Sequence, residues 1–206
     1  MAYLRGRCIH PNVLAFCRRE GILYQTSFKN HPNCVFVGRD GEGVAKGRSL
    51  RGCTQLQFRR DIPGSKKIYP FYIAASGNAD TVEVYEAPID AMSGASLKLM
   101  QHTGPWRSVH YLALGGTDYA ALDAFLKYFP PVRKIVLSET PSVLSGINRI
   151  QRWSQSKPLY LVFLLSSCQY IVFLWKGRGD IRNKHPFGHE AGCSPLPGSV
   201  NSGTRK

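Results

Sequence analysis

The residues best placed for chemistry lie in the segment 81–93, where a carboxylate follows a short apolar strand. Residues 82–85 are typical of a strand, Glu86 comes next, and a turn with Pro88 leads into a helix. Open α/β folds bind their ligands at the carboxyl ends of strands, so Glu86 stands where such a fold would place chemistry. Asp90 follows one helical turn later and can face the same way. The structural alternative for both is an acidic residue stabilised by a helix N-terminus.

A second group of reactive side chains is basic. Arg59 and Arg60 precede the expected loop at 61–67, and Lys66 and Lys67 close it. Tyrosine and phenylalanine residues at 69–72 interleave with these charges. Cations beside aromatic rings suit single-stranded nucleic acid, because the rings stack on bases and the cations hold phosphates. Alternation along a strand also predicts that half of these rings belong to the core.

The composition favours an anionic partner for the chain. The 206 residues carry 27 Lys and Arg against 13 Asp and Glu, a formal net charge of +14. Nucleic acid is the commonest partner of so basic a protein. Hydrophobic residues make up 43% of the sequence, enough for a substantial core. The six cysteines form no C-x-x-C pair and no signal peptide is visible, so we expect reduced thiols and a cytoplasmic protein.

The pattern of the first eighty residues predicts a small α+β module. Apolar residues recur at helical spacing over 3–24, and Gly21 is expected to close that helix. Expected strands follow at 33–38, 44–51, 55–58 and 68–73. A turn at 39–43 with an Asp-Gly pair joins the first two strands into a hairpin.

From residue 80 the pattern changes to an alternation of strands and helices. Strands are expected at 82–85, 109–114 and 134–137, and helices at 91–101 and 119–128. This alternation predicts an α/β fold, with flanking helices on a parallel sheet, preceded by the small α+β module.

The last third of the chain is different in character. Residues 159–175 are almost wholly apolar except around 166–169. Two buried strands joined at the Ser-Ser pair explain this segment. A membrane span is the alternative, although the run is shorter than the roughly 20 residues that a spanning helix needs. Residues 176–206 are rich in Gly, Pro, Ser and basic residues and are expected to form a disordered tail.

Three runs of sequence together resemble the Toprim domain of bacterial primases, topoisomerases and some nucleases. They are Tyr85-Glu-Ala-Pro-Ile-Asp-Ala-Met-Ser93, Tyr111-Leu-Ala-Leu-Gly-Gly116 and Arg133-Lys-Ile-Val-Leu137. The resemblance is closer to primase-like Toprim proteins of bacterial mobile elements and plasmids, in which a module of unknown function precedes the Toprim core. Segments 3–9, 21–24, 35–38, 51–52 and 64–69 resemble that module. The expected division is a module at 1–78, a partial Toprim-like core at 79–137 and a divergent segment at 138–206.

The resemblance implies a role for Glu86 in acid–base chemistry or in holding Mg²⁺, with Asp90 as a further candidate ligand. The family also places an Asp-x-Asp pair after a later strand, and these carboxylates bind Mg²⁺. Here residues 138–142 read Ser-Glu-Thr-Pro-Ser, and Glu139 is their one carboxylate. Either a degenerate copy or a frameshift near codon 138 accounts for this departure.

These observations lead to two hypotheses about function. The first is a Toprim-like, DNA-binding protein related to primases and replication proteins of mobile elements, with an impaired Mg²⁺ site and with nucleic-acid contacts at the four basic residues above. The second is a catalytically inactive remnant, or an interaction module without an activity of its own.

Overall fold

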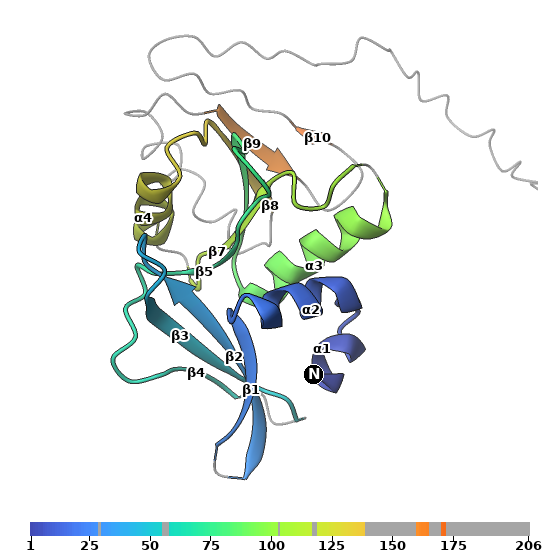
Figure 1. Ribbon diagram of the computed structural model, residues 1–206, viewed down its shortest axis with the longest axis vertical. Coiled ribbons are helices and arrows are strands. Elements are labelled where there is room, and N and C mark those ends of the chain that lie inside the picture. The colour runs from blue at the N-terminus through green and yellow to red at the C-terminus, as the bar shows by residue number, and fades with distance from the viewer. Residues whose placement is uncertain are drawn as a thin grey trace, which may run out of the picture.

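The computed structural model describes residues 1–28, 30–54, 58–102, 104–116, 119–138, 160–164 and 170–171 (Figure 1). The N-terminal part contains helices α1 (Ala2–Gly6) and α2 (Pro11–Arg19), and strands β1 (Leu23–Phe28), β2 (His31–Arg39), β3 (Ala45–Gly52), β4 (Arg59–Asp61) and β5 (Phe71–Ile73). The following part contains β6 (Thr81–Tyr85), α3 (Pro88–Met100), β7 (His110–Ala113), α4 (Ala120–Tyr128), β8 (Lys134–Ser138), β9 (Tyr160–Leu164) and β10 (Tyr170–Ile171).

The strands of the described residues join into one mixed sheet. Its order is β10-β9-β8-β6-β7-β5-β2-β3-β4, and β1 pairs with β2. The pairs β6–β7, β6–β8 and β8–β9 are parallel, whereas the N-terminal strands pair antiparallel. The predicted α/β fold with a parallel sheet and a preceding α+β module is therefore confirmed.

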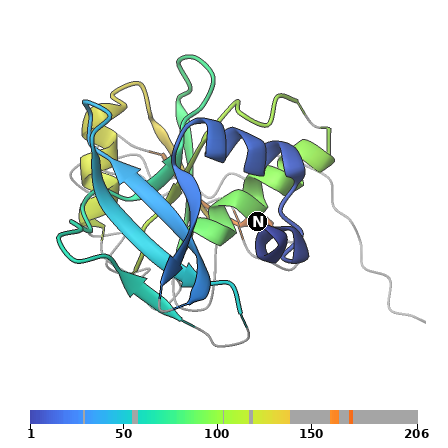
Figure 2. The same cartoon turned by 60° about the horizontal axis from the view of Figure 1, so that its bottom comes forward.

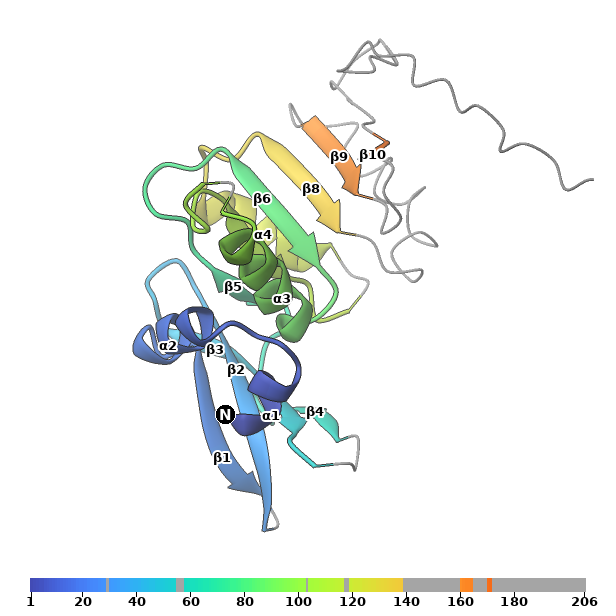
Figure 3. The same ribbon diagram turned by 90° about the vertical axis from the view of Figure 1, so that its right-hand side faces the viewer.

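Helices cover both faces of the parallel strands. Along β6, Val82 and Val84 point to the core beneath α4, and the alternate residues Glu83 and Tyr85 face the side of α3. A second core lies among α1, α2, α3 and the N-terminal strands. Figure 3 shows the parallel strands above the N-terminal strands, with α3 alongside α2.

The predicted single helix over 3–24 is wrong. Its place is taken by α1 and α2, which Cys8 separates in a left-handed conformation with φ 61°. Pro11 begins α2, where its missing N–H costs nothing, and His10 caps that helix by accepting a hydrogen bond from the Asn12 N–H at 3.1 Å. Both helices bury their apolar sides in the same core, which is why the apolar spacing continues across the break. Gly21, at φ 66°, follows the C-cap of α2 as expected, and β1 begins two residues later.

Other observed element boundaries differ from the predicted ones by a few residues. The strand expected at 55–58 falls mostly outside the described residues, and the strand found is β4, directly after it. Only the last part of the strand expected at 68–73 is a strand, as β5. The strands and helices expected between 80 and 137 are all present, with α3 beginning at Pro88 rather than residue 91.

The C-terminal third is described only at Ser138, β9 and β10, so the predicted tail at 176–206 lies outside the described residues. Strands β9 and β10 pair antiparallel, and β9 continues the parallel sheet in register with β8. The two-strand interpretation of 159–175 is thus confirmed for these residues. Within the described ranges, none of the helices has the length and apolar character to cross a membrane.

Two facing glycines determine where the loop before β5 can lie. Gly38 of β2 pairs with Gly47 of β3, and a Cβ at either position would overlap the carbonyl oxygen of Tyr69. The loop therefore rests directly on strand backbone. The Lys66 N–H donates to the Lys46 carbonyl at 3.0 Å, which ties the loop further to β3.

We predict that Gly47→Ala destabilises the fold by about 1–3 kcal/mol, because the new methyl group meets backbone that cannot rotate away. Chemical denaturation measures the change in the free energy of unfolding. Gly6→Ala is the control, since nothing lies within 4 Å of a Cβ at that helical position, and it should stabilise by about 0.5–1 kcal/mol. Equal effects of the two substitutions would contradict the tight contact.

Candidate functional site

A cleft of about 250 Å³ lies where the N-terminal sheet meets the beginning of α3. Its floor includes Phe36 of β2, and its far wall is formed by Pro88 and Ile89. Both signs of charge line it, and the charged residues are Arg7, Arg51, Arg59, Asp61, Glu86 and Asp90. The cleft therefore combines the acidic residues and part of the basic cluster that the sequence indicated separately.

The end of β6 places Glu86 at the cleft. The hydrogen bonds between β6 and β7 continue past the ends of both strands. The Leu114 N–H donates to the Tyr85 carbonyl and the Gly115 N–H donates to the Glu86 carbonyl, each at 2.9 Å. Pro88 then begins α3, whose N-cap Ala87 offers no side-chain hydrogen bond. Asp90 lies in the first turn of that helix, and both carboxylates are half-buried. Both residues therefore line the same cleft, Glu86 just after β6 and Asp90 in the first turn of α3.

The surroundings of Asp90 disfavour the charged form of its carboxyl group. Burial raises the pKa of its carboxyl above the ordinary value of 3.8, and the neighbouring Glu86 raises the pKa further. A backbone hydrogen bond at Ala87 and the positive charges of Arg7 and Arg51 oppose this shift. The arginines thus partly offset the cost of keeping two carboxylates close together.

Arg59 spans the mouth of the cleft. Its guanidinium donates to the Gly115 carbonyl at 3.4 Å, which links β4 to the turn after β7. Gly115 has φ 71°, a conformation that glycine adopts without strain. This turn therefore ends the strand and also lets its backbone form part of the cleft wall.

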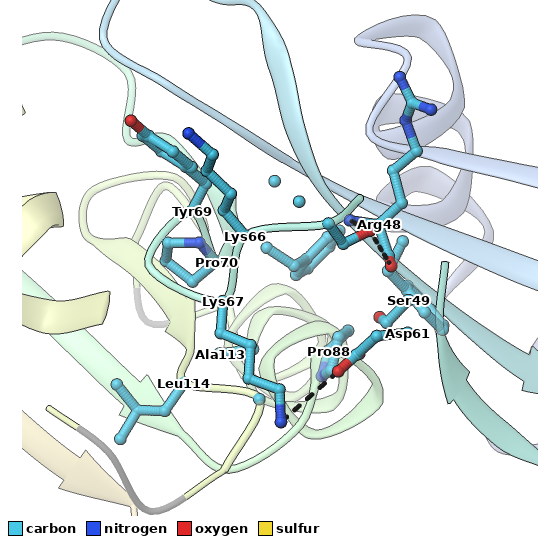
Figure 4. A pocket seen from close by; sticks show the side chains of 16 residues that line it. Arg48, Ser49, Asp61, Lys66, Lys67, Tyr69, Pro70, Pro88, Ala113 and Leu114 are labelled. Atoms are coloured by element: carbon cyan, nitrogen blue, oxygen red, sulfur yellow. Dashed lines mark hydrogen bonds and ion pairs between the residues drawn. The ribbon is translucent and has the colours of Figure 1, made fainter. Parts of the chain in front are cut away.

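A smaller hollow of about 50 Å³ continues the cleft toward the loop before β5 (Figure 4). The two hollows share Phe36, Ser49, Asp61, Pro88 and Gly115, so together they form one groove. The additional cations of the second hollow are Arg48, Lys66 and Lys67. Figure 4 shows Lys67 reaching toward Asp61, and the two form an exposed ion pair at 3.6 Å.

Three of the four basic residues singled out in the sequence line this groove, namely Arg59, Lys66 and Lys67. Arg60 does not line the groove. It follows Arg59 in β4, and neighbouring residues of a strand point to opposite faces of the sheet. Its partner across the β3–β4 pair is Leu50. Arg7, Arg48 and Arg51 were missed. Arg51 faces Arg59 across the β3–β4 pair, a register that no local pattern of sequence reveals.

Two of the three rings next to the basic cluster pack in the cores, on opposite faces of β5. Phe71 is buried against Phe36, with ring centroids 5.7 Å apart. Tyr72 packs on Phe125 and Phe129, each at 5.5 Å. Tyr69 and Phe71 both line the smaller hollow of the groove.

The last residue of β8 lies beside the end of β6. Strand β8 is parallel to β6 with Val84 opposite Leu137, so Ser138 comes next to Tyr85 and forms a side-chain hydrogen bond with it. Glu139 and Thr140 fall outside the described residues. Within the part of the chain that the structure describes, no three His, Cys, Asp or Glu side chains gather closely enough to hold a metal ion.

Comparisons with known proteins indicate a primase-like fold. Residues 2–78 match the model of a family described as a protein of unknown function (DUF3991). No curated protein sequence matches the chain. The fold is similar to the primase fragment of the bacteriophage T7 primase-helicase, with a TM-score of 0.50 and 17% identity over 75% of this chain. The chain spans 61% of that fragment.

Two further structures show the same likeness. A chain in the bacteriophage T7 complex of lagging-strand DNA polymerase with primase domains gives a TM-score of 0.51 and 18% identity, covering 76% of each chain. The E. coli primase catalytic core gives 0.50 and 13% identity, covering 81% of this chain and 65% of the core. At these identities the likeness establishes the fold alone.

We predict that Asp90→Asn stabilises the protein by an amount that grows with pH. Below the ordinary pKa of 3.8 the carboxyl is protonated in both the folded and unfolded states, so the substitution changes little. Between 3.8 and the raised folded pKa the unfolded state loses its proton before the folded state does, so the wild-type protein loses stability over this range, whereas the amide stays neutral; above the folded pKa the difference is constant. Denaturation of both proteins at acidic and neutral pH measures this.

Glu42→Gln serves as the control, because Glu42 is exposed in the β2–β3 turn. A stability difference for Asp90→Asn that stays constant across the pH range would show that the desolvation of Asp90 is not its cause.

Proposed function

We propose that this chain is a nucleic-acid-binding protein of the primase type, and that DNA lies in the groove between the N-terminal sheet and α3. The observation that carries the proposal is the groove itself, where cations from α1, β3, β4 and the loop before β5 surround the carboxyl end of β6. The likeness of the fold to primases supports it. The resemblance of 85–137 to Toprim proteins of mobile elements points in the same direction.

The charge of the groove suits a phosphate backbone. Its cations are Arg7, Arg48, Arg51, Arg59, Lys66 and Lys67, and its carboxylates are Asp61, Glu86 and Asp90. Arginines present planar forks of donors that match phosphate oxygens in pairs. Lys66 and Lys67 lie at the outer end, where they can attract a strand before it enters.

We further propose that the Mg²⁺ site implied by the family is impaired here. Glu86 and Asp90 supply oxygen ligands, but Arg7, Arg51 and Arg59 share the cleft and repel a cation. Mg²⁺ dehydrates reluctantly and depends on carboxylates and substrate phosphates to hold it. The donor set of the described cleft therefore fits a phosphate group better than a divalent metal, and we assign no catalytic step to the metal.

Ser138 favours a second candidate function, an interaction module without its own catalysis. Ser138 ends β8 beside Tyr85, with which its hydroxyl forms a side-chain hydrogen bond, so the described end of this neighbouring parallel strand supplies no carboxylate. Primer-synthesis, nicking and nuclease assays with Mg²⁺ separate the two functions. Activity that disappears in Glu86→Gln would exclude the module without catalysis.

We predict salt-sensitive binding to single-stranded DNA, because cations that contact phosphates release counterions. Fluorescence anisotropy at several salt concentrations gives the slope of log affinity against log salt. Arg51→Gln and Arg59→Gln should each reduce this slope by about 0.7–1. Lys127→Gln, an exposed change in the last turn of α4, is the control. Absence of binding at low salt would remove the proposed function.

We predict weak binding of Mg²⁺ to the free protein, which isothermal titration calorimetry measures directly. Two half-buried carboxylates among three arginines do not offset the dehydration of this ion. Glu86→Gln should then leave the titration unchanged. Tight, stoichiometric binding that is lost in Glu86→Gln would contradict the impaired site and restore the catalytic interpretation.

A further inference from the structure

The face of the N-terminal sheet that points away from α1 and α2 carries exposed aromatic rings. Tyr24 is 42% exposed and Phe28 is 38% exposed. Leu23 of β1 pairs with Phe36 and belongs to the core under the helices, so Tyr24, opposite Val35, points to the outer face. Figures 2 and 3 show both helices on one side of these strands.

An apolar hollow of about 330 Å³ lies on this outer face. Val35 and Leu50 form its base, and both belong to a small apolar cluster of their own. Phe28 stacks on Phe58 at the edge, with ring centroids 6.0 Å apart and planes inclined by 19°. A hollow lined by exposed aromatic rings offers ring faces on which a planar ligand can stack.

Arg60 lines the same hollow, and so does Asp61, which the hollow shares with the groove and which pairs with Lys67. Arg60 is exposed, and the β3–β4 register pairs it with Leu50. Its side chain therefore points to the face of the sheet opposite to that of Arg59. Successive residues of one strand thus direct one cation to the groove and one to the aromatic face. Arg60 supplies the positive charge that a ligand with both flat rings and anionic groups requires.

A basic path connects the groove to this face. The smaller hollow of the groove shares Arg48 and Lys66 with a third hollow of about 120 Å³, which Lys46 also lines. That third hollow shares Pro63 with the aromatic one. A strand that leaves the groove can therefore pass around the loop before β5 with cations alongside it and reach Tyr24.

We propose that the outer face is a stacking platform for unpaired bases of the nucleic-acid strand that leaves the groove. The rings of Tyr24 and Phe28 stack on bases, and Arg60 contacts the adjoining phosphate. This inference rests on the proposed function, and its ligand is single-stranded nucleic acid, because the faces of bases inside a duplex are already stacked. Stacking of this kind tolerates any base sequence.

Fluorescence anisotropy with two single-stranded oligonucleotides, of about 4 and about 16 nucleotides, tests the proposal over the range of site sizes known for such surfaces. Tyr24→Ser should weaken binding of the long oligonucleotide about fivefold to a hundredfold and leave the short one unchanged, because only the long one reaches the platform. Phe28→Leu, which keeps the apolar contact with Phe58 but removes the ring, should act in the same direction. Arg60→Gln should lower the salt slope for the long oligonucleotide alone.

Tyr128→Ser is the matched control, since Tyr128 is 41% exposed on α4, away from the platform. Photocrosslinking of a long oligonucleotide that contains 5-iodouracil, followed by mass spectrometry, should locate adducts at Tyr24 or Phe28. Thermal denaturation confirms that each variant is folded.

The outcomes separate this inference from the function on which it rests. Failure of both oligonucleotides to bind the wild-type protein would remove the proposed function. Normal binding of both, unaffected by Tyr24→Ser and Phe28→Leu, would overturn the platform alone. Equal competition by duplex DNA of the same length would also overturn it. So would a dimer in sedimentation that Tyr24→Ser dissociates, because the occupant would then be a second copy of the chain.

Discussion

The site depends on the short strand β5, which joins two sheets of different character into one. Its residues Phe71–Ile73 pair with β7 on one side, and Phe71 also pairs with Gly38 at the end of β2. Because β3 occupies the other edge of β2, β1 and β5 share its remaining edge at opposite ends. This arrangement brings the N-terminal strands against the carboxyl end of β6, and the groove is the space left between them.

The packing around β5 explains why such a short strand can hold this arrangement. Phe71 is buried beside Phe36 in the core that α1, α2 and α3 share. Tyr72, the next residue, points to the opposite face and packs on α4 through Phe125 and Phe129. One short strand therefore anchors both cores, and the bare backbone of Gly38 and Gly47 lets the preceding loop fold flat against the sheet.

The groove places two carboxylates and several arginines close together. Glu86 and Asp90 lie close enough for one to raise the pKa of the other, and Arg7 and Arg51 lower it in turn. The neutral Ser138 at the end of β8 adds no further anionic ligand on the neighbouring strand. The proposed binding of nucleic acid therefore rests on the basic residues of this groove, on a fold similar to that of primases.

Local sequence determined the class of the fold, most of its elements after residue 80, and the positions of Glu86 after β6 and of Asp90 in the first turn of α3. These depend on alternation, helical spacing and turn residues, all of which act over a few neighbours. The break at Cys8, the separation of Arg59 from Arg60 and the recruitment of Arg7, Arg48 and Arg51 were decided only by tertiary structure. They follow from strand register and from the packing of α1 on a distant core, and contacts between residues far apart in the chain leave no periodic trace in the sequence.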